Sequence, residues 1–167
     1  MTARVVVWLT EGMWEAAVDA VARTVAATTE PMAVTLLYVI DAQVSEAVHG
    51  AFGALLGRGM RDRDPGTAVE AAARHAAADL LEAARHRLGR DAELVVRTGR
   101  VEREVVSACA GAELLVCVRD GDYSRLGPHS LGHHTRFVVD HAPCAVLLLW
   151  PGTAPGLSSI PPPPDQR

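Results

Sequence analysis

Five short apolar runs recur along the chain and predict the strands of one sheet. Most of them are continuous blocks of β-branched and aliphatic residues, without the alternation of polar and apolar positions that half-exposed strands show. Such blocks are typical of strands that helices cover on both faces. The runs occupy residues 3–9, 32–40, 93–98, 113–118 and 144–150.

Apolar residues at helical spacing fill the segments between these runs. In residues 12–27 they follow one another at steps of four, three and four, which places them on one face of a helix. Residues 65–88 repeat this pattern, with Pro65 at the start and Gly89 just past the end. Helices favour these two residues at these two positions, so both segments are predicted to be helical.

Two shorter helices are predicted in the second half of the chain. They span residues 101–110 and 131–141, and the second has Ser130 as its candidate N-cap and Pro143 as its stop. Strands and helices therefore alternate along the sequence. This alternation predicts a parallel sheet with helices on both faces and right-handed crossovers, which is the doubly wound α/β class.

The insert at residues 41–64 is longer than an ordinary connection between a strand and a helix. Val44, Val48 and Leu55 in it suggest a short extra helix. Residues 57–64 are rich in glycine and charge, and we expect them to form a mobile loop.

The end of the chain differs in composition from the rest. Residues 151–167 hold six of the ten prolines, four of them consecutive. We therefore expect a proline-rich, disordered tail without regular structure, following a single folded domain at residues 1–150.

All 16 strongly basic residues are arginine, and the chain contains no lysine. This absence excludes a Walker A phosphate loop, which needs its lysine on the phosphates. It also excludes Schiff-base and pyridoxal phosphate chemistry, and the phosphate lysine of protein kinases. A phosphoacceptor receiver domain has a similar five-stranded architecture, but it needs a lysine after its last strand and is excluded too.

Charge and cysteine usage narrow the class further. The formal net charge of −4 argues against a nucleic-acid partner, which would require a basic patch. No apolar stretch reaches the roughly 18 residues of a membrane span, and the first residues do not read as a signal peptide. Three widely spaced cysteines form no disulfide framework and no metal motif. We therefore expect a cytoplasmic protein that binds neither nucleic acid nor membrane.

The connection at residues 119–134 carries the most informative candidate chemistry. Ligands of open α/β sheets bind beyond the carboxyl ends of the strands, where this segment leads from the fourth predicted strand to the last helix. Gly121, Gly127 and Gly132 make it glycine-rich, and backbone amides in such a loop attract anions. Its arginines would add positive charge, whereas its two aspartates oppose an anion. An anion site and an ordinary glycine-rich connection both remain open.

At this loop the sequence resembles the universal stress protein family, and the resemblance covers residues 3–150. It rests on VVVWL in the first strand, VTLLYVID in the second, GRVEREVVSACAGAELLVCV around the fourth, and above all TRFVVDHAPCAVLLLW at the end. The resemblance implies a five-stranded parallel sheet of order 3-2-1-4-5, as in adenine nucleotide alpha hydrolase-like proteins. It also implies a stress-associated regulatory or binding protein rather than an enzyme.

Many members of that family bind ATP through a motif of G-x-x-G, nine residues, then glycine with serine or threonine. Counting back from the last helix places Gly132 on the final glycine, His133 on the serine or threonine, and Arg119 and Asp122 on the two earlier glycines. The resemblance therefore implies a degenerate motif. Asp122 would put a carboxylate beside the phosphates, so ATP binding is expected to be weak or lost.

Further residues are assigned to the site by the same resemblance. Gly121 replaces a motif glycine if the loop shifts by one residue, and Gly127 is an additional glycine. The family's first-strand aspartate, which contacts the adenosine part of the nucleotide, corresponds to Thr10. Val39 matches the second-strand residue that lines the adenine site, and His134 is a candidate anion contact at the helix start.

Other conspicuous residues are expected to be structural. His129 and His133 stand four residues apart, but a zinc site needs three or four ligands, so no metal site is predicted. Trp8 is expected to pack in the core rather than against a ligand ring. Among the cysteines, Cys109 at a helix end is the one expected to have some exposure, and none is predicted to be a nucleophile.

The last predicted strand, residues 144–150, would be an apolar edge strand that invites pairing with another chain. Members of the resembled family commonly dimerise there, so we expect a homodimer formed through this strand. Two functions remain open. One is a dimeric regulatory protein with weak or lost adenine-nucleotide binding. The other is a universal stress protein that binds ATP, with or without slow ATP hydrolysis. No catalytic residue is predicted for either.

Overall fold

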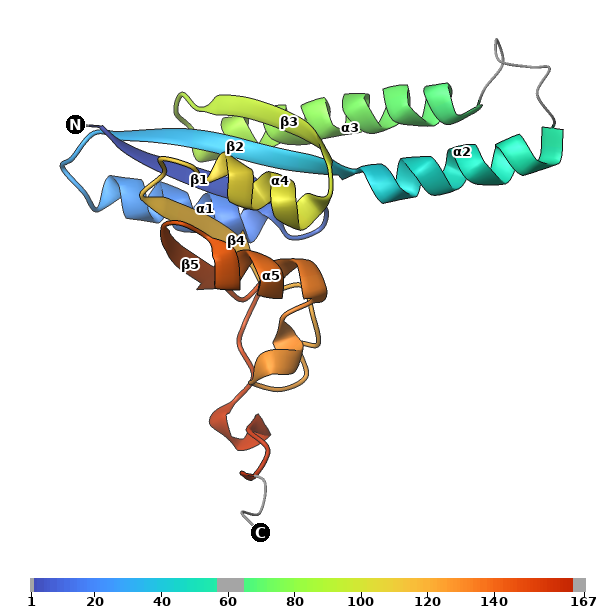
Figure 1. The fold of residues 1–167 in the computed structure, drawn as a ribbon. Helices are drawn as coiled ribbons and strands as arrows, with labels where there is room; N and C mark the ends of the chain where they lie inside the picture. The colour runs from blue at the N-terminus through green and yellow to red at the C-terminus, as the bar shows by residue number, and fades with distance from the viewer. Residues whose placement is uncertain (1, 57–64, 164–167) are drawn as a thin grey trace.

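The computed structural model describes residues 2–56 and 65–163, which form a five-stranded parallel sheet covered by helices (Figure 1). The strand order is β3-β2-β1-β4-β5, and each neighbouring pair is parallel. The predicted doubly wound class and its strand order are therefore confirmed. The strands span Ala3–Leu9 (β1), Met32–Asp41 (β2), Glu93–Gly99 (β3), Leu114–Val118 (β4) and Ala145–Leu149 (β5).

Helices cover both faces of the sheet, with α1 and α3 on one face and α4 and α5 on the other. In β1, Val5 and Val7 pack with the first pair of helices, whereas Val6 and Trp8 pack with the second pair. Successive residues of a strand face opposite sides, so a strand buried on both faces must be apolar throughout. These helices span Trp14–Ala26 (α1), Pro65–Leu88 (α3), Val101–Ala108 (α4) and His133–His141 (α5).

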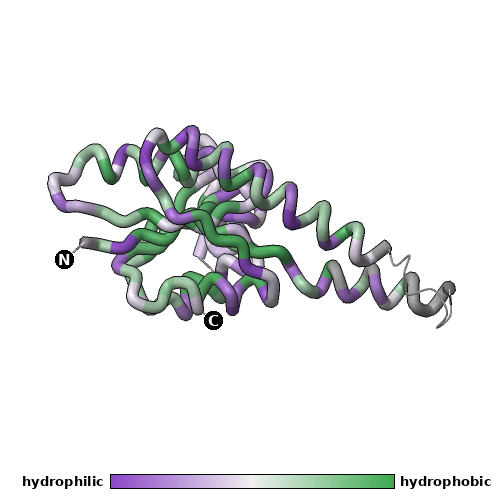
Figure 2. Tube along the Cα trace, turned by 90° about the horizontal axis from the view of Figure 1, so that it is seen from above, coloured by the Kyte–Doolittle hydropathy of each residue, from purple (hydrophilic) through white to green (hydrophobic). Residues whose placement is uncertain are grey.

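The strands form the apolar centre of the molecule. Figure 2 shows hydrophobic residues concentrated along the central strands, with polar residues interspersed along the surrounding helices. Val5, Val6 and Val7 are completely buried. Burial of each such side chain stabilises the fold by about 1.5–3 kcal/mol, so β1 contributes several kcal/mol to the core.

The insert after β2 forms one helix, α2 (Ala42–Leu56), which has 15 residues and is longer than the short helix predicted. It lies beside the first part of α3, and the two extend together away from the sheet (Figure 1). Val44 is 60% exposed, while the side chains of Val48 and Leu55 and the predicted loop at 57–64 lie outside the described residues. None of the helices in the described ranges is long and apolar enough to cross a membrane.

The predicted cap of the last helix is wrong. Helix α5 begins at His133 with Gly132 as its N-cap, and no side chain caps it. Ser130 instead lies in a short 3-10 helix (Pro128–Ser130), where its hydroxyl donates to the Gly127 carbonyl at 2.7 Å. Because the backbone is extended at the two residues after this turn, α5 starts two residues later than predicted.

The proline-rich tail contains one short helical turn within its described residues. Leu157–Ser159 form a 3-10 helix, and the Ser159 hydroxyl accepts a hydrogen bond from the Leu126 amide at 3.0 Å. Leu157 and Ile160 stay exposed, and the tail runs away from the sheet (Figure 1). A serine side chain therefore ties this tail to the connection after β4.

The cysteines also differ from expectation, because Cys109 is buried and Cys144 is the partly exposed one. Both pack on the face of the sheet that α4 and α5 cover, together with Cys117. Burial, with Cys144 as a further cause for Cys109, raises the pKa of the Cys109 and Cys117 thiols to about 12. These two thiols are therefore uncharged core groups at neutral pH.

Candidate functional site

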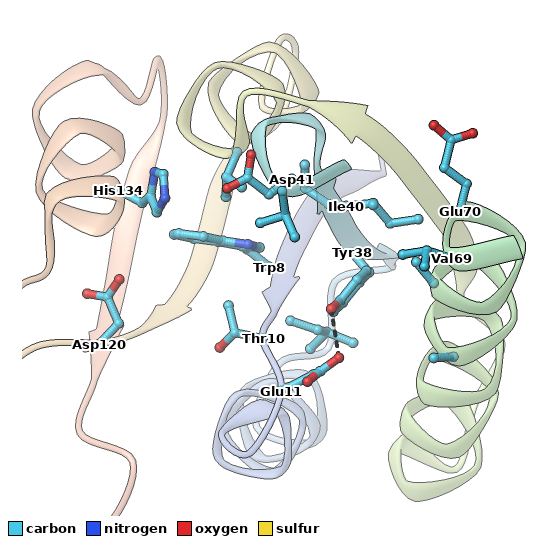
Figure 3. A pocket seen from close by; sticks show the side chains of 16 residues that line it. Trp8, Thr10, Glu11, Tyr38, Ile40, Asp41, Val69, Glu70, Asp120 and His134 are labelled. Carbon is cyan, nitrogen blue, oxygen red and sulfur yellow. Dashed lines mark hydrogen bonds between the residues drawn. The ribbon is translucent and has the colours of Figure 1, made fainter. Parts of the chain in front are cut away.

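A cavity of about 500 Å³ opens at the carboxyl ends of β1 and β2, next to α2 and α3 (Figure 3). Its size is that of a small-molecule site, and ligands of open α/β sheets bind at this end of the strands. The lining residues are Trp8, Leu9, Thr10, Glu11, Tyr38, Val39, Ile40, Asp41, Val44, Val69, Glu70, Ala73, Ala76, Val101, Asp120 and His134.

The predicted site residues divide into two groups. Thr10, Val39 and His134 line the cavity, coming from the end of β1, from β2 and from the first turn of α5. The others belong to the connection between β4 and α5 but are not among the lining residues: Arg119, Gly121, Asp122, Gly127, Gly132 and His133. The predicted loop thus lies next to the cavity, and only its edges reach it.

Several lining residues were not assigned to the site by the sequence analysis, although Asp41 and Asp120 lie in segments expected at this edge of the sheet. Tyr38 and Asp41 stand near the end of β2, and Asp120 follows β4 by two residues. Their place after neighbouring parallel strands was a usable signal, because those ends meet at one edge of the sheet. The lining residues of α3 could not be predicted from the sequence. Tertiary packing decides which turn of a long helix faces a cavity, and no local pattern indicates it.

Two aromatic side chains, Trp8 and Tyr38, are among the lining residues of the cavity. Trp8 is only 4% exposed and belongs to the core under α4 and α5, yet it also lines the cavity, in the middle of the side chains drawn in Figure 3. The Tyr38 hydroxyl donates to Glu11 Oε1 at 3.1 Å. Burial, followed by the Glu11 carboxylate, raises the pKa of Tyr38 to about 12, so its phenol is neutral at physiological pH.

The glycine-rich connection uses its own amides to hold itself together. The Gly121 amide donates to the Ser130 carbonyl at 3.0 Å, and the Asp122 amide donates to the His129 carbonyl at 2.8 Å. A phosphate-binding loop needs such amides free to face the ligand. These two donors are already satisfied within the chain and are not available to an anion.

The carboxylate at the start of α5 belongs to Asp120, not to Asp122. Asp120 Oδ1 accepts a hydrogen bond from the Gly132 amide at 2.7 Å, and Asp120 also lines the cavity. Asp122 instead accepts a hydrogen bond from the Ser124 amide at 2.9 Å, a local turn contact. The Ser124 side chain, followed by this amide, holds the pKa of the Asp122 carboxyl below its usual value. Asp120 therefore occupies the N-terminus of α5, where an external anion would otherwise bind.

Arg119 of the connection and Arg136 of α5 make their contacts outside the cavity. The Arg119 guanidinium carbon lies 4.6 Å from the centroid of the Trp150 ring, and its Nη1 donates to the Ser130 hydroxyl. Arg136 Nη2 donates to the Pro128 carbonyl at 2.8 Å. Both guanidinium groups therefore brace the connection and the end of β5, and neither lines the cavity.

His134 is the histidine that reaches the cavity, and it is held by a carboxylate. Its Nδ1 lies 2.8 Å from Glu102 Oε2, and both side chains are largely buried. A backbone hydrogen bond at Glu102 and the contact with His134 hold the pKa of the Glu102 carboxyl below its usual value. This pair links the first turns of α4 and α5 at the edge of the cavity that His134 lines.

The lining carries far more negative than positive charge. Its carboxylates are Glu11, Asp41, Glu70 and Asp120, and it contains no arginine. Among these carboxylates, Glu70 has a basic partner: its Oε1 lies 3.3 Å from His49 Nε2. Within the described residues, no group of three or more histidine, cysteine or acidic side chains could hold a metal ion.

Comparison with known proteins defines the class of this fold. No protein-family model and no curated protein sequence matches the chain. Among solved structures, hypothetical protein MJ0577 is 17% identical at a TM-score of 0.67, with 92% of this chain and 99% of that one covered. A universal stress protein in complex with cAMP is 19% identical at 0.58, covering 90% and 98%. The universal stress protein of Archaeoglobus fulgidus is 15% identical at 0.52, covering 89% and 93%.

These similarities extend over almost the whole length of each protein. At such low sequence identities they show a shared fold. The chain shares the fold of these universal stress proteins, with the strand order 3-2-1-4-5 that its sequence resemblance implied.

Proposed function

We propose that this protein is a regulatory or binding protein of the universal stress class, whose cavity takes a nucleoside-sized ring and whose ATP binding is weak or lost. One observation carries the proposal: the Asp120 carboxylate accepts the Gly132 amide hydrogen bond at the start of α5. The competing function is an ATP-binding universal stress protein with slow hydrolysis.

A phosphate that approached the Gly132 amide would meet the Asp120 carboxylate, which already accepts the hydrogen bond from that amide. Two like unit charges about 4 Å apart repel each other by about 1 kcal/mol in water, and by about 4 kcal/mol at the effective dielectric constant of a protein surface. Moving Asp120 aside would break a charge-assisted hydrogen bond worth about 1.5–3 kcal/mol. Either route makes a triphosphate an unfavourable ligand.

The rest of the cavity supports a ring as the bound group. Trp8, Tyr38 and Val39 supply aromatic and aliphatic surface, and Thr10 supplies a hydroxyl. One protein of the same fold was solved in complex with cAMP. That complex supports an adenine-like ring as the ligand class here.

The charges of the cavity favour a protein that binds its ligand without turning it over. Phosphoryl transfer depends on cations placed against the transferring group. The lining described here has no arginine, and the chain has no lysine. We therefore propose no catalytic residue and no ATPase activity.

Calorimetry with adenosine and with ATP and Mg²⁺ tests this function. We expect the protein to bind adenosine at least about tenfold more tightly than ATP, because only ATP brings phosphates to Asp120. Asp120→Asn removes the charge and is expected to improve the dissociation constant for ATP about tenfold, or about 1.4 kcal/mol, with little change for adenosine.

Asp91→Asn is the matched control, because Asp91 is exposed before β3, at the opposite end of the strands. It alters the net charge equally and is expected to change neither dissociation constant. A wild-type dissociation constant for ATP below about 10 μM, near −7 kcal/mol, would support the ATP-binding alternative instead. Binding of neither ligand would remove the nucleoside proposal.

We also propose that the protein is a homodimer formed through β5 and its flanks, at residues 144–150. β5 is an edge strand of apolar residues, and an unpaired apolar edge favours pairing with a second chain. Size-exclusion chromatography with light scattering is expected to report twice the 17.7 kDa mass of one chain. A single species of monomer mass at micromolar concentration would contradict this prediction.

A further inference from the structure

The cavity presents apolar surface that water covers in the free protein. Val44 of α2 and Val69 of α3 are 60% and 42% exposed, which makes them two of the few large apolar side chains on the surface. Both line the cavity, and Figure 3 shows Val69 close to Tyr38. A bound ring would remove this surface from water, at about 25 cal/mol for each Å² of apolar area that it buries.

Acidic side chains surround this apolar surface on more than one side. Figure 3 shows Glu11 and Asp41 near the ends of β1 and β2, and Asp120 across the cavity beside His134. Their positions on three separate strands or strand ends mean that a ligand in the cavity meets negative charge from several directions. Carboxylates arranged in this way favour a positive ligand and oppose a negative one.

Three basic groups on elements around the cavity are engaged with other partners. Arg97 of β3 lies 3.5 Å from Glu104 and donates to the Ser107 hydroxyl at 3.3 Å. His134 is held by Glu102, and Arg119 stacks on Trp150, as described above. Neither of these two arginines lines the cavity, and the described lining residues include no arginine that could offset the charges of Asp41 and Asp120.

We propose that this cavity selects an aromatic ring system that carries a positive charge, such as an N-alkylated or protonated heteroaromatic base. The inference deepens the proposed function, since it assumes that a nucleoside-sized ring enters the cavity. Trp8 and Tyr38 supply aromatic surface, and a cation over an aromatic face gains about 0.5–2 kcal/mol. The apolar walls hold the ring, and the carboxylates of Asp41 and Asp120 select its charge.

Two isomeric nucleosides separate charge from size. 1-Methyladenosine carries a positive charge at neutral pH, whereas N6-methyladenosine has the same carbon framework and is neutral. In calorimetry at about 50 mM salt we expect the cationic isomer to bind about tenfold more tightly, which corresponds to about 1.4 kcal/mol. The preference is expected to shrink at about 200 mM salt, because screening weakens attraction between partly exposed charges.

Substitutions identify the charges responsible. Asp41→Asn and Asp120→Asn are each expected to reduce the preference for the cationic isomer about threefold and to leave the neutral isomer's dissociation constant within about twofold. The Asp91→Asn control described above is expected to keep the full preference. A preference that persists unchanged in both cavity variants and at both salt concentrations would come from methyl-group fit, and it would overturn the proposal.

The outcomes distinguish this inference from the proposed function. If both isomers and adenosine bind with equal affinity, the ring site stands and charge selection is refuted. If the neutral isomer binds more tightly, charge selection is likewise refuted. If adenosine and both isomers fail to bind to a protein whose unfolding curve shows it to be folded, the proposed function fails together with the inference.

Discussion

Replacing Trp8 with alanine is expected to lower the free energy of unfolding by about 3–5 kcal/mol, the cost of deleting a buried aromatic side chain. The side chain is 4% exposed and packs with Val6 of its own strand and Val105 of α4, so its removal leaves a void on that face of the sheet. The same void would join the cavity. We therefore also expect loss of ring binding, measured by calorimetry at a temperature where the variant stays folded.

Trp150→Ala provides the matched comparison for Trp8. Trp150 follows β5, is partly exposed, and contacts the edge of Tyr123 and the guanidinium of Arg119. We expect Trp150→Ala to lower the free energy of unfolding by less than half as much as Trp8→Ala, because less of the Trp150 surface leaves water on folding. Urea unfolding followed by circular dichroism measures both variants. Equal losses would mean that Trp8 is not the more important core residue.

Gly121→Ala is expected to destabilise the protein by about 1–3 kcal/mol, because its side chain would overlap backbone that has little freedom to move. A Cβ at this position would lie 2.3 Å from the His129 carbonyl oxygen and 2.7 Å from the Ser130 carbonyl carbon. The connection would have to open, which would break the hydrogen bond from the Gly121 amide to the Ser130 carbonyl. Urea unfolding measures the loss.

Gly152→Ala is the control for this substitution. No heavy atom lies within 4 Å of a Cβ at Gly152, and its φ is not in the left-handed region. We expect its free energy of unfolding to change by less than about 0.5 kcal/mol. If Gly121→Ala were equally neutral, the close approach between the two halves of the connection would not contribute to stability.

Two of the three glycines of the connection show how far a motif can be interpreted from sequence. Gly121 was predicted to replace a phosphate-contacting glycine. The structure shows that a glycine is needed there for another reason, because the backbone of Ser130 approaches too closely for a side chain. Gly132 aligned with the final motif glycine, and its amide does lie at the start of α5, but that amide donates to Asp120. The same residues can therefore surround a phosphate or exclude it, depending on where one neighbouring carboxylate lies.

The order of strands and helices was within reach of the sequence, because apolar periodicity is a local property of the chain. A strand such as β1 has to be apolar throughout when helices cover both its faces, and a helix such as α3 has to repeat its apolar residues at helical spacing. The start of α5 was misplaced by two residues for the opposite reason. Its first turn is set by the contacts of Ser130 and Asp120, which come from outside the helix.

By itself the sequence determined the doubly wound class, the edge position of the last strand, and the absence of lysine chemistry. Only the tertiary structure decided that Asp120, rather than Asp122, occupies the start of α5, and that α3 supplies a wall of the cavity. It also decided that Arg119 turns to Trp150 and away from the cavity. The physical reason is that periodicity follows from neighbours along the chain, whereas the direction of a charged side chain in a connection follows from partners that folding brings from elsewhere.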